Sequence, residues 1–207
     1  PNAKKISSNL EDCLNIWQEF MDKFPQDEPF PTFPIWTMEF GATYPYDTKK
    51  TPAQYGVHKL KSFQGSFGIP LSSYRAEDRL EGIPKYASTE QDEFPDWKKY
   101  YIRANREFYK KHKSWLKHWI PKIQDFENSH QKFEWNCGEV PLTINDKIIQ
   151  FRPSGIRVKM PTYSPALVLT TTQIPIFPWL GRYMTRKEAA KLQCMEELTE
   201  LPPTIAK

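Results

Sequence analysis

The chain has 207 residues, of which 39% are hydrophobic and 14% aromatic, and it carries a net charge of +4. This length and composition exclude a disordered tail and favour a globular protein with a substantial core. No apolar run reaches the ~18 residues that a membrane-spanning helix needs, so we expect no membrane partner.

Two contrasting segments come first along the chain. Residues 9–24 predict a helix, because apolar side chains recur at steps of three and four residues before Pro25. Residues 25–36 contain four prolines among aromatic residues, which predicts an extended segment laid across a surface. Residues 37–95 carry turn signals at several glycines, and we expect long loops of a kind that is usually functional or partly disordered.

The clearest element is a long helix over residues 96–120, which we expect Pro121 to end. One face is predicted to lie in the core: Trp97, Tyr101, Ala104, Phe108, His112, Trp115 and Trp119. The opposite face is basic: Lys99, Arg103, Arg106, Lys110, Lys113 and Lys117. Like charges at four-residue spacing repel by about 0.2–0.5 kcal/mol per pair, so this face indicates a polyanionic partner such as a DNA backbone. A solvated helix in a mildly basic protein is the alternative.

Short strands are predicted at residues 147–151, 156–160 and 166–172. Arg152, Arg157 and Lys159 surround a Pro-Ser-Gly turn, and the last two would lie on the same side of a strand. They could grip phosphates or be plain surface charges, and their spacing does not decide between the two. A final helix is predicted to begin near Thr185, which has capping-box spacing to Glu188.

Catalytic and metal-binding motifs are not found in the sequence. It contains no GxSxG elbow, no P-loop and no GxGxxG. No cysteine and histidine pair has metal-site spacing, so we expect no metal. The three cysteines, Cys13, Cys137 and Cys194, are far apart and odd in number, which suits free thiols in a reducing cytoplasm.

One segment carries a resemblance to a known family. Residues 181–193 (GRYMTRKEAAKLQ) resemble the penultimate conserved motif of DNA (cytosine-5) methyltransferases, Arg-Tyr-Leu-Thr-x-Arg-Glu-Ala-Ala-Arg-Leu-Gln. This sequence has Met184 in place of Leu, and Lys187 and Lys191 in place of Arg. A subgroup of these enzymes is also similar at residues 36–45, 131–137, 151–159, 165–167 and 173–176, so the resemblance extends over nearly the whole chain.

The resemblance implies a two-lobed enzyme. A large lobe holds S-adenosylmethionine and a Pro-Cys nucleophile that attacks a cytosine flipped out of the duplex, and a small target-recognition lobe reads the sequence. The motif that organises the small lobe corresponds here to Arg182, Thr185, Glu188 and Gln193, and Arg182 could contact phosphate or tie the motif to the recognition lobe.

The sequence departs from the family at the catalytic motifs. None of the three cysteines follows a proline, and Glu-Asn-Val, Phe-x-Gly-x-Gly and the closing Gly-Asn-x-Val are missing. We therefore expect the chain to begin after the catalytic motifs and to stop before the last motif. It would hold no cofactor and no catalytic residue, whereas the intact enzyme would use S-adenosylmethionine.

Together these features predict an α+β fold with one long basic and aromatic helix, a few short strands and long loops. Residues 1–145 would be the DNA-binding recognition domain, and residues 146–207 the strand segment and motif that organise it. The predicted partners are double-stranded DNA and the missing catalytic lobe, in a cytoplasmic restriction-modification system. The DNA-binding candidates are Lys99, Arg103, Arg106, Lys110, Arg152, Arg157, Lys159 and Arg182. A stand-alone nucleic-acid-binding module and the recognition subunit of a split methyltransferase are the alternatives.

Overall fold

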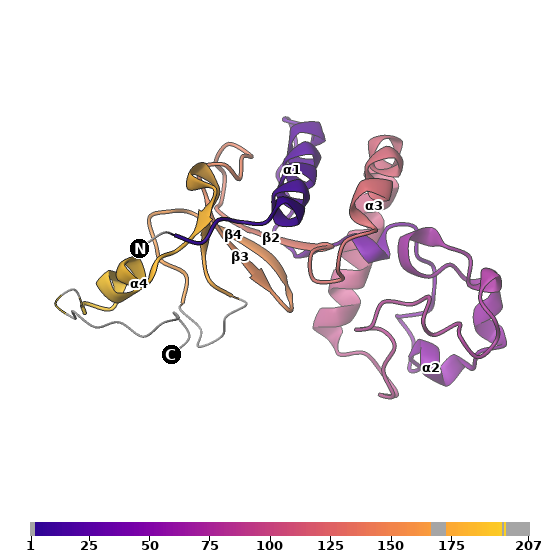
Figure 1. The fold of residues 1–207 in the computed structure, drawn as a ribbon. Coiled ribbons are helices and arrows are strands. Elements are labelled where there is room, and N and C mark those ends of the chain that lie inside the picture. The colour runs from indigo at the N-terminus through magenta and orange to yellow at the C-terminus, as the bar shows by residue number, and fades with distance from the viewer. Residues whose placement is uncertain (1–2, 167–172, 196, 198–207) are drawn as a thin grey trace. The chain divides into compact units, whose positions relative to one another are not determined.

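The computed structural model describes residues 3–166, 173–195 and 197, which form two compact units (Figure 1). Unit 1 combines Pro1–Thr32 with Phe126–Lys207, and unit 2 is Phe33–Asp125. Helices, a mixed sheet and long loops confirm the predicted α+β class. The boundaries of these two compact units do not fall at residue 145, because the first helix packs against strands from the second half of the chain. The functional division at residue 145 stays a prediction.

Helix α1 (Ser8–Lys23) confirms the predicted helix and covers the sheet of unit 1. The Ser7 hydroxyl caps it by accepting a hydrogen bond from the Leu10 amide. The Trp17 ring stacks on Phe133 of strand β2 with 4.5 Å between ring centroids, and its indole N–H donates to the His130 carbonyl at 2.9 Å. Burying an aromatic ring with its polar N–H satisfied anchors α1 on the sheet.

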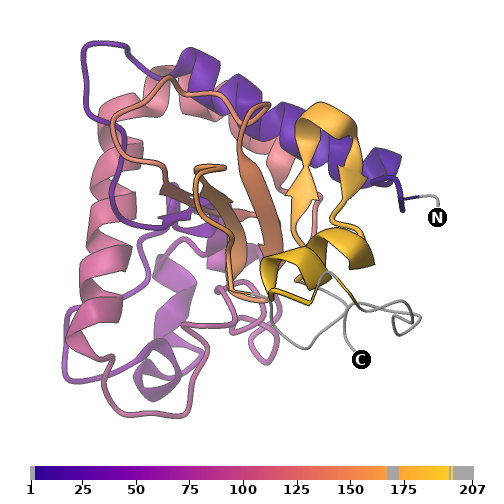
Figure 2. The same cartoon turned by 90° about the vertical axis from the view of Figure 1, so that its left-hand side faces the viewer.

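The sheet of unit 1 runs in the order β2 (Lys132–Asn136), β4 (Gly155–Lys159), β3 (Ile148–Arg152), β5 (Ile176–Phe177), β6 (Arg182–Tyr183). Strand β2 is parallel to β4, and the other pairs are antiparallel. Figure 2 shows the short helix η5 (Pro178–Leu180) linking β5 to β6, with α4 (Arg186–Leu192) following. Two predicted strands are confirmed to within a residue, and β2 was not predicted. The strand predicted at 166–172 lies, except for its first residue, outside the described residues.

Side chains alternate between the two faces of this sheet, as a period of two requires. One face is apolar and buried: Phe133, Trp135, Ile149, Phe151, Ile156 and Val158. The register places polar side chains on the other face: Glu134, Gln150, Arg152, Arg157 and Lys159. The predicted common side of Arg157 and Lys159 is thereby confirmed.

Unit 2 is built from short helices and turns beside one long helix, α3 (Asp96–Ile123). Along residues 35–73 the elements are β1 (Ile35–Trp36), η1 (Thr37–Glu39), α2 (Pro52–Tyr55), η2 (Lys59–Ser62), η3 (Ser66–Gly68) and η4 (Leu71–Ser73). The predicted loop-rich character of this region is confirmed. A core made largely of single residues from separate loops holds it together: Trp36, Ala42, Tyr44, Leu60, Leu71, Ile83, Ala87, Phe94 and Ile102.

Helix α3 confirms the predicted long helix but differs from it in two respects. It continues through Pro121, and its local break lies instead at His112 (φ −106°, ψ 15°). The predicted aromatic face is only partly buried, since Phe108 and Trp119 are buried but Trp97 is 55% exposed. Asn105 and Arg106 are buried instead. Asn105 accepts a hydrogen bond from the Trp36 amide and donates one to the Pro34 carbonyl, so α3 holds the segment at residues 34–36 by hydrogen bonds as well as by apolar contact.

Candidate nucleic-acid interface

The first half of the basic face of α3 is paired with acids of the same unit. Lys99 forms ion pairs with Glu93 and, at 3.9 Å, with Asp96. Arg103 donates to a carboxylate oxygen of Asp47 at 3.0 Å. The Arg103–Asp47 pair is exposed on both sides, whereas the Lys99 side chain is only 14% exposed beside its two exposed acids. Exposed pairs contribute only about 0–1 kcal/mol each, so a phosphate could compete with Asp47 for Arg103.

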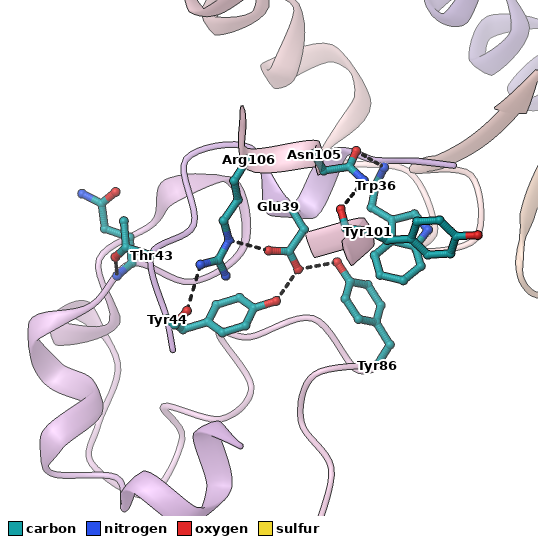
Figure 3. Close-up of polar contacts among 9 residues, drawn as sticks. Trp36, Glu39, Thr43, Tyr44, Tyr86, Tyr101, Asn105 and Arg106 are labelled. Carbon is teal, nitrogen blue, oxygen red and sulfur yellow. Dashed lines mark hydrogen bonds and ion pairs between the residues drawn. The ribbon is translucent and has the colours of Figure 1, made fainter. Parts of the chain in front are cut away.

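Arg106 differs from its neighbours because its guanidinium lies inside unit 2 (Figure 3). Its Nε donates to Glu39 at 2.9 Å, and an Nη donates to the Tyr44 carbonyl at 2.9 Å. The Glu39 carboxylate is fully buried and also accepts hydrogen bonds from the hydroxyls of Tyr44 and Tyr86. The ring centroids of Tyr44 and Tyr46 lie 4.3 and 4.7 Å from the guanidinium carbon. This cluster accounts for Arg106 in α3 without a DNA phosphate.

The electrostatics of this cluster keep Tyr44, Tyr86 and Arg106 in their protonated forms. Burial and the charge of Glu39 raise the pKa of Tyr44 and of Tyr86 well above the usual range, so both phenols stay protonated as donors. Burial opposes the charge of Arg106, but the charge interactions and hydrogen bonds with Glu39 and Tyr44 together outweigh it and raise the arginine pKa. The carboxylate therefore meets a permanent cation and two permanent hydrogen-bond donors.

The second half of the basic face is free. Lys110, Lys113 and Lys117 are exposed, and none forms an ion pair within the described part of the chain. Residues three and four apart lie on one side of a helix, so these lysines form a single cationic edge of α3. This half of the predicted DNA-binding face is available to a phosphate backbone.

The arginines of the sheet share one acid. Arg152 lies 2.5 Å and Arg157 3.2 Å from the carboxylate oxygens of Glu134. Burial opposes ionisation of Glu134, but hydrogen bonds from Asn136 and Arg152, and the charge of Arg157, lower its pKa below the usual range. Two guanidiniums against one carboxylate leave a positive excess. Both Nε atoms are buried without a partner among the described residues, and Lys159 is half-buried on the same face.

The predicted organising motif forms as a connected unit. Thr185 caps α4, its hydroxyl accepting from the Glu188 amide at 3.2 Å, and Glu188 accepts from the Thr185 amide at 2.7 Å, which confirms the capping box. Arg182 grips the Glu188 carboxylate with two hydrogen bonds of 2.9 and 2.8 Å. Arg182 therefore ties β6 to α4. Gln193 follows the last turn of α4 with an exposed side chain.

The two buried cysteines, Cys13 and Cys137, do not have the features of an activated nucleophile. Burial raises the pKa of the Cys13 thiol to about 12 and that of Cys137 to about 11, and Cys194 is exposed. A raised pKa suppresses the reactive thiolate. Among the described residues no three metal-ligating side chains gather, and none of their helices is long and apolar enough to cross a membrane.

Sequence reasoning did not foresee two acids that organise these cations. Glu39 stands between Met38 and Phe40 in a segment that turned out to be buried, and an acid with apolar neighbours is a signal for a buried partner. Glu134 lies on β2, which was not predicted. The alternation Phe133, Glu134, Trp135 could have indicated a strand with the acid on its polar face.

Comparison with known proteins finds one relative. The chain is 38% identical over 107 residues to the type II methyltransferase M.AluI of Cellulosimicrobium cellulans. The match covers 50% of this chain and 20% of the relative, so the matched part of the chain spans about a fifth of the length of that protein. No family model and no solved structure matches the chain. The similarity to a methyltransferase agrees with the resemblance seen in the sequence.

Proposed function

We propose that this chain is the DNA-binding, sequence-recognising part of a DNA (cytosine-5) methyltransferase of a restriction-modification system. The observation that supports this proposal most directly is the similarity to the type II methyltransferase. It is supported further by the exposed lysines that form no ion pair within the described residues. The free lysines of α3 and the arginine excess on the sheet face supply sequence-independent attraction to phosphates. The loops of unit 2 supply side chains for reading bases.

The chemistry of methyl transfer is assigned to another part of the enzyme. S-adenosylmethionine carries a positively charged sulfonium, whereas the pocket beside η2 is lined by Lys59 and Lys61, which would repel it. The buried thiols of Cys13 and Cys137 have raised pKa values and do not fit the role of nucleophile. This pocket therefore does not fit the cofactor, and these two thiols do not fit the nucleophile.

Binding of the 207-residue chain to duplex DNA across a salt series tests the proposal. If four phosphates are neutralised, the slope of log K against log salt is about −3.6, and affinity falls roughly 100-fold between 50 and 200 mM salt. Selection from a random duplex library should enrich one short sequence. Affinity that does not change with salt, or a library that shows no enrichment, would contradict the electrostatic or the recognition half of the proposal.

A methylation assay tests the division of labour. The chain incubated with labelled S-adenosylmethionine and cytosine-containing duplexes is expected to transfer no label, because the proposal places the nucleophile and the cofactor site in another part of the enzyme. A longer protein with the catalytic motifs should label the same duplex sequence that this chain selects. Labelling by the chain alone, or selection of a different sequence, would refute the assignment.

A further inference from the structure

An open pocket of about 680 Å³ lies within unit 2, beside η2. The rings of Tyr55 and Phe63 form an aromatic corner in it, with centroids 6.4 Å apart and planes at 88°. An imidazole, two ammonium groups and two hydroxyls complete the lining: His58, Lys59, Lys61, Ser62 and Ser72. The pocket thus joins a surface for a flat or apolar group to donors for an anion.

The charges at this pocket are not neutralised by the protein. No acid lines it, and Lys59 and Lys61 are exposed and form no ion pair within the described ranges. On α3, by contrast, Lys99 and Arg103 each hold an acid of the same unit. The two pocket lysines are therefore available to a negatively charged ligand.

A buried arginine holds the walls of the pocket. Arg79, 8% exposed, donates to the carbonyls of Val57 at 2.8 Å and Leu71 at 3.3 Å, the residues next to the pocket-lining His58 and Ser72. Its acceptors are neutral carbonyls, so its full positive charge stays behind the pocket. Walls held by buried hydrogen bonds are preorganised, and a ligand loses less entropy when it binds them.

The loops behind these walls meet at very short range. The Ser66 amide donates to the Gly82 carbonyl at 2.8 Å, and a Cβ added at Gly65 would lie 2.1 Å from that same oxygen. The Leu71 amide donates to the Phe63 carbonyl at 2.9 Å, which joins η4 to the aromatic corner. The pocket is therefore part of a packed loop structure and not a surface hollow between independent loops.

We infer that this pocket binds a nucleotide unit of the DNA, with its phosphate on Lys59 and Lys61 and its sugar or base against Tyr55 and Phe63. The inference rests on the proposed function and adds to it the residues of the loop unit that hold the nucleic acid. An aromatic surface accepts any base or sugar, and two free ammonium groups beside it fit a phosphodiester.

Charge removal with a matched control tests the lysines. The double variant Lys59→Gln/Lys61→Gln should reduce the magnitude of the salt slope by about 1.8 and lower affinity at 0.1 M salt roughly tenfold for each lysine. The control Lys49→Gln/Lys50→Gln makes the same charge change at exposed residues of the same unit outside the pocket. Equal losses of DNA affinity in both variants would overturn the inference about the pocket without contradicting DNA binding by the chain. A wild-type chain without DNA affinity would instead overturn the proposed function.

Photocrosslinking tests the aromatic corner without a variant that could misfold. A duplex carrying 5-iodo-deoxyuridine at successive positions is irradiated with the wild-type chain, and the crosslinked peptide is located by mass spectrometry. Crosslinks within residues 55–63 at one or two positions are expected. Crosslinks confined to other aromatic residues, such as the exposed Trp97 and Tyr100 of α3, would overturn the inference.

Discussion

Replacing Arg106 by Met should destabilise unit 2 strongly without weakening a phosphate contact. The substitution keeps the apolar stem of the side chain but leaves the Glu39 carboxylate, fully buried, without its cation. Removing one partner of a buried ion pair costs about 3–5 kcal/mol. The lost hydrogen bond to the Tyr44 carbonyl adds roughly 1 kcal/mol. This is a large fraction of the ~5–15 kcal/mol that stabilises a typical domain.

A second substitution separates the charge from the packing. Glu39→Gln alone should destabilise the chain, because it leaves Arg106 buried without a counter-charge. In the Arg106→Met background the same change should be stabilising, since a neutral amide oxygen still accepts from Tyr44 and Tyr86. The change of sign is the signature of a buried ion pair.

Urea unfolding, followed by tryptophan fluorescence and circular dichroism, measures these differences. Lys110→Met, one turn further along the same helix, is the control and should change stability by no more than about 0.5 kcal/mol. It should reduce the magnitude of the salt slope of DNA binding by about 0.9, whereas Arg106→Met should leave the slope unchanged. A loss below about 1 kcal/mol for Arg106→Met, or a reduced slope, would refute the structural role of Arg106.

Three further predictions concern the charged edge, the capping box and the thiols. The free lysines of α3 are Lys110, Lys113 and Lys117. Replacing them by Gln should weaken binding to all DNA sequences about equally, which fluorescence anisotropy with several duplexes would measure. A loss confined to one sequence would make α3 a base reader instead. Hydrogen bonds from Arg182 lower the pKa of Glu188 to about 2 against the effect of burial, so its contribution to α4 is present above its ordinary pKa of 4.5 and is lost as pH falls toward 2. Hydrogen exchange of α4 should show this loss, and Glu188→Gln, which keeps capping-box geometry, should remove it; an unchanged pH profile in that variant would exclude the ion pair as its cause. A thiol reagent at pH 8 should modify Cys194 alone in the native chain and Cys13 and Cys137 only after unfolding, because burial raises the pKa of both; equal native reactivity would contradict their burial.

The sequence indicated local elements well and the partners of charged residues poorly. Helix α1, the capping box at Thr185 and the alternation of β4 follow from periodicity and spacing within a few residues, so they could be predicted. Counting cations along α3 could not show that Arg106 meets Glu39, 67 residues away in the chain. Charge alone gives the same pattern for a phosphate contact and a buried ion pair.

By itself the sequence determined the α+β class, the long helix and the methyltransferase-like motif, because each is written in residues close together in the chain. Only the tertiary structure decided which cations are free, since pairing depends on acids brought from distant segments: Asp47 to Arg103, Glu39 to Arg106, and Glu134 to both Arg152 and Arg157. It also brought Tyr55, Phe63 and Ser72 together around Lys59 and Lys61 through loops without periodicity. The conformation of these loops depends on contacts between segments distant in the chain, such as the hydrogen bonds of Arg79. Local sequence patterns do not predict such contacts.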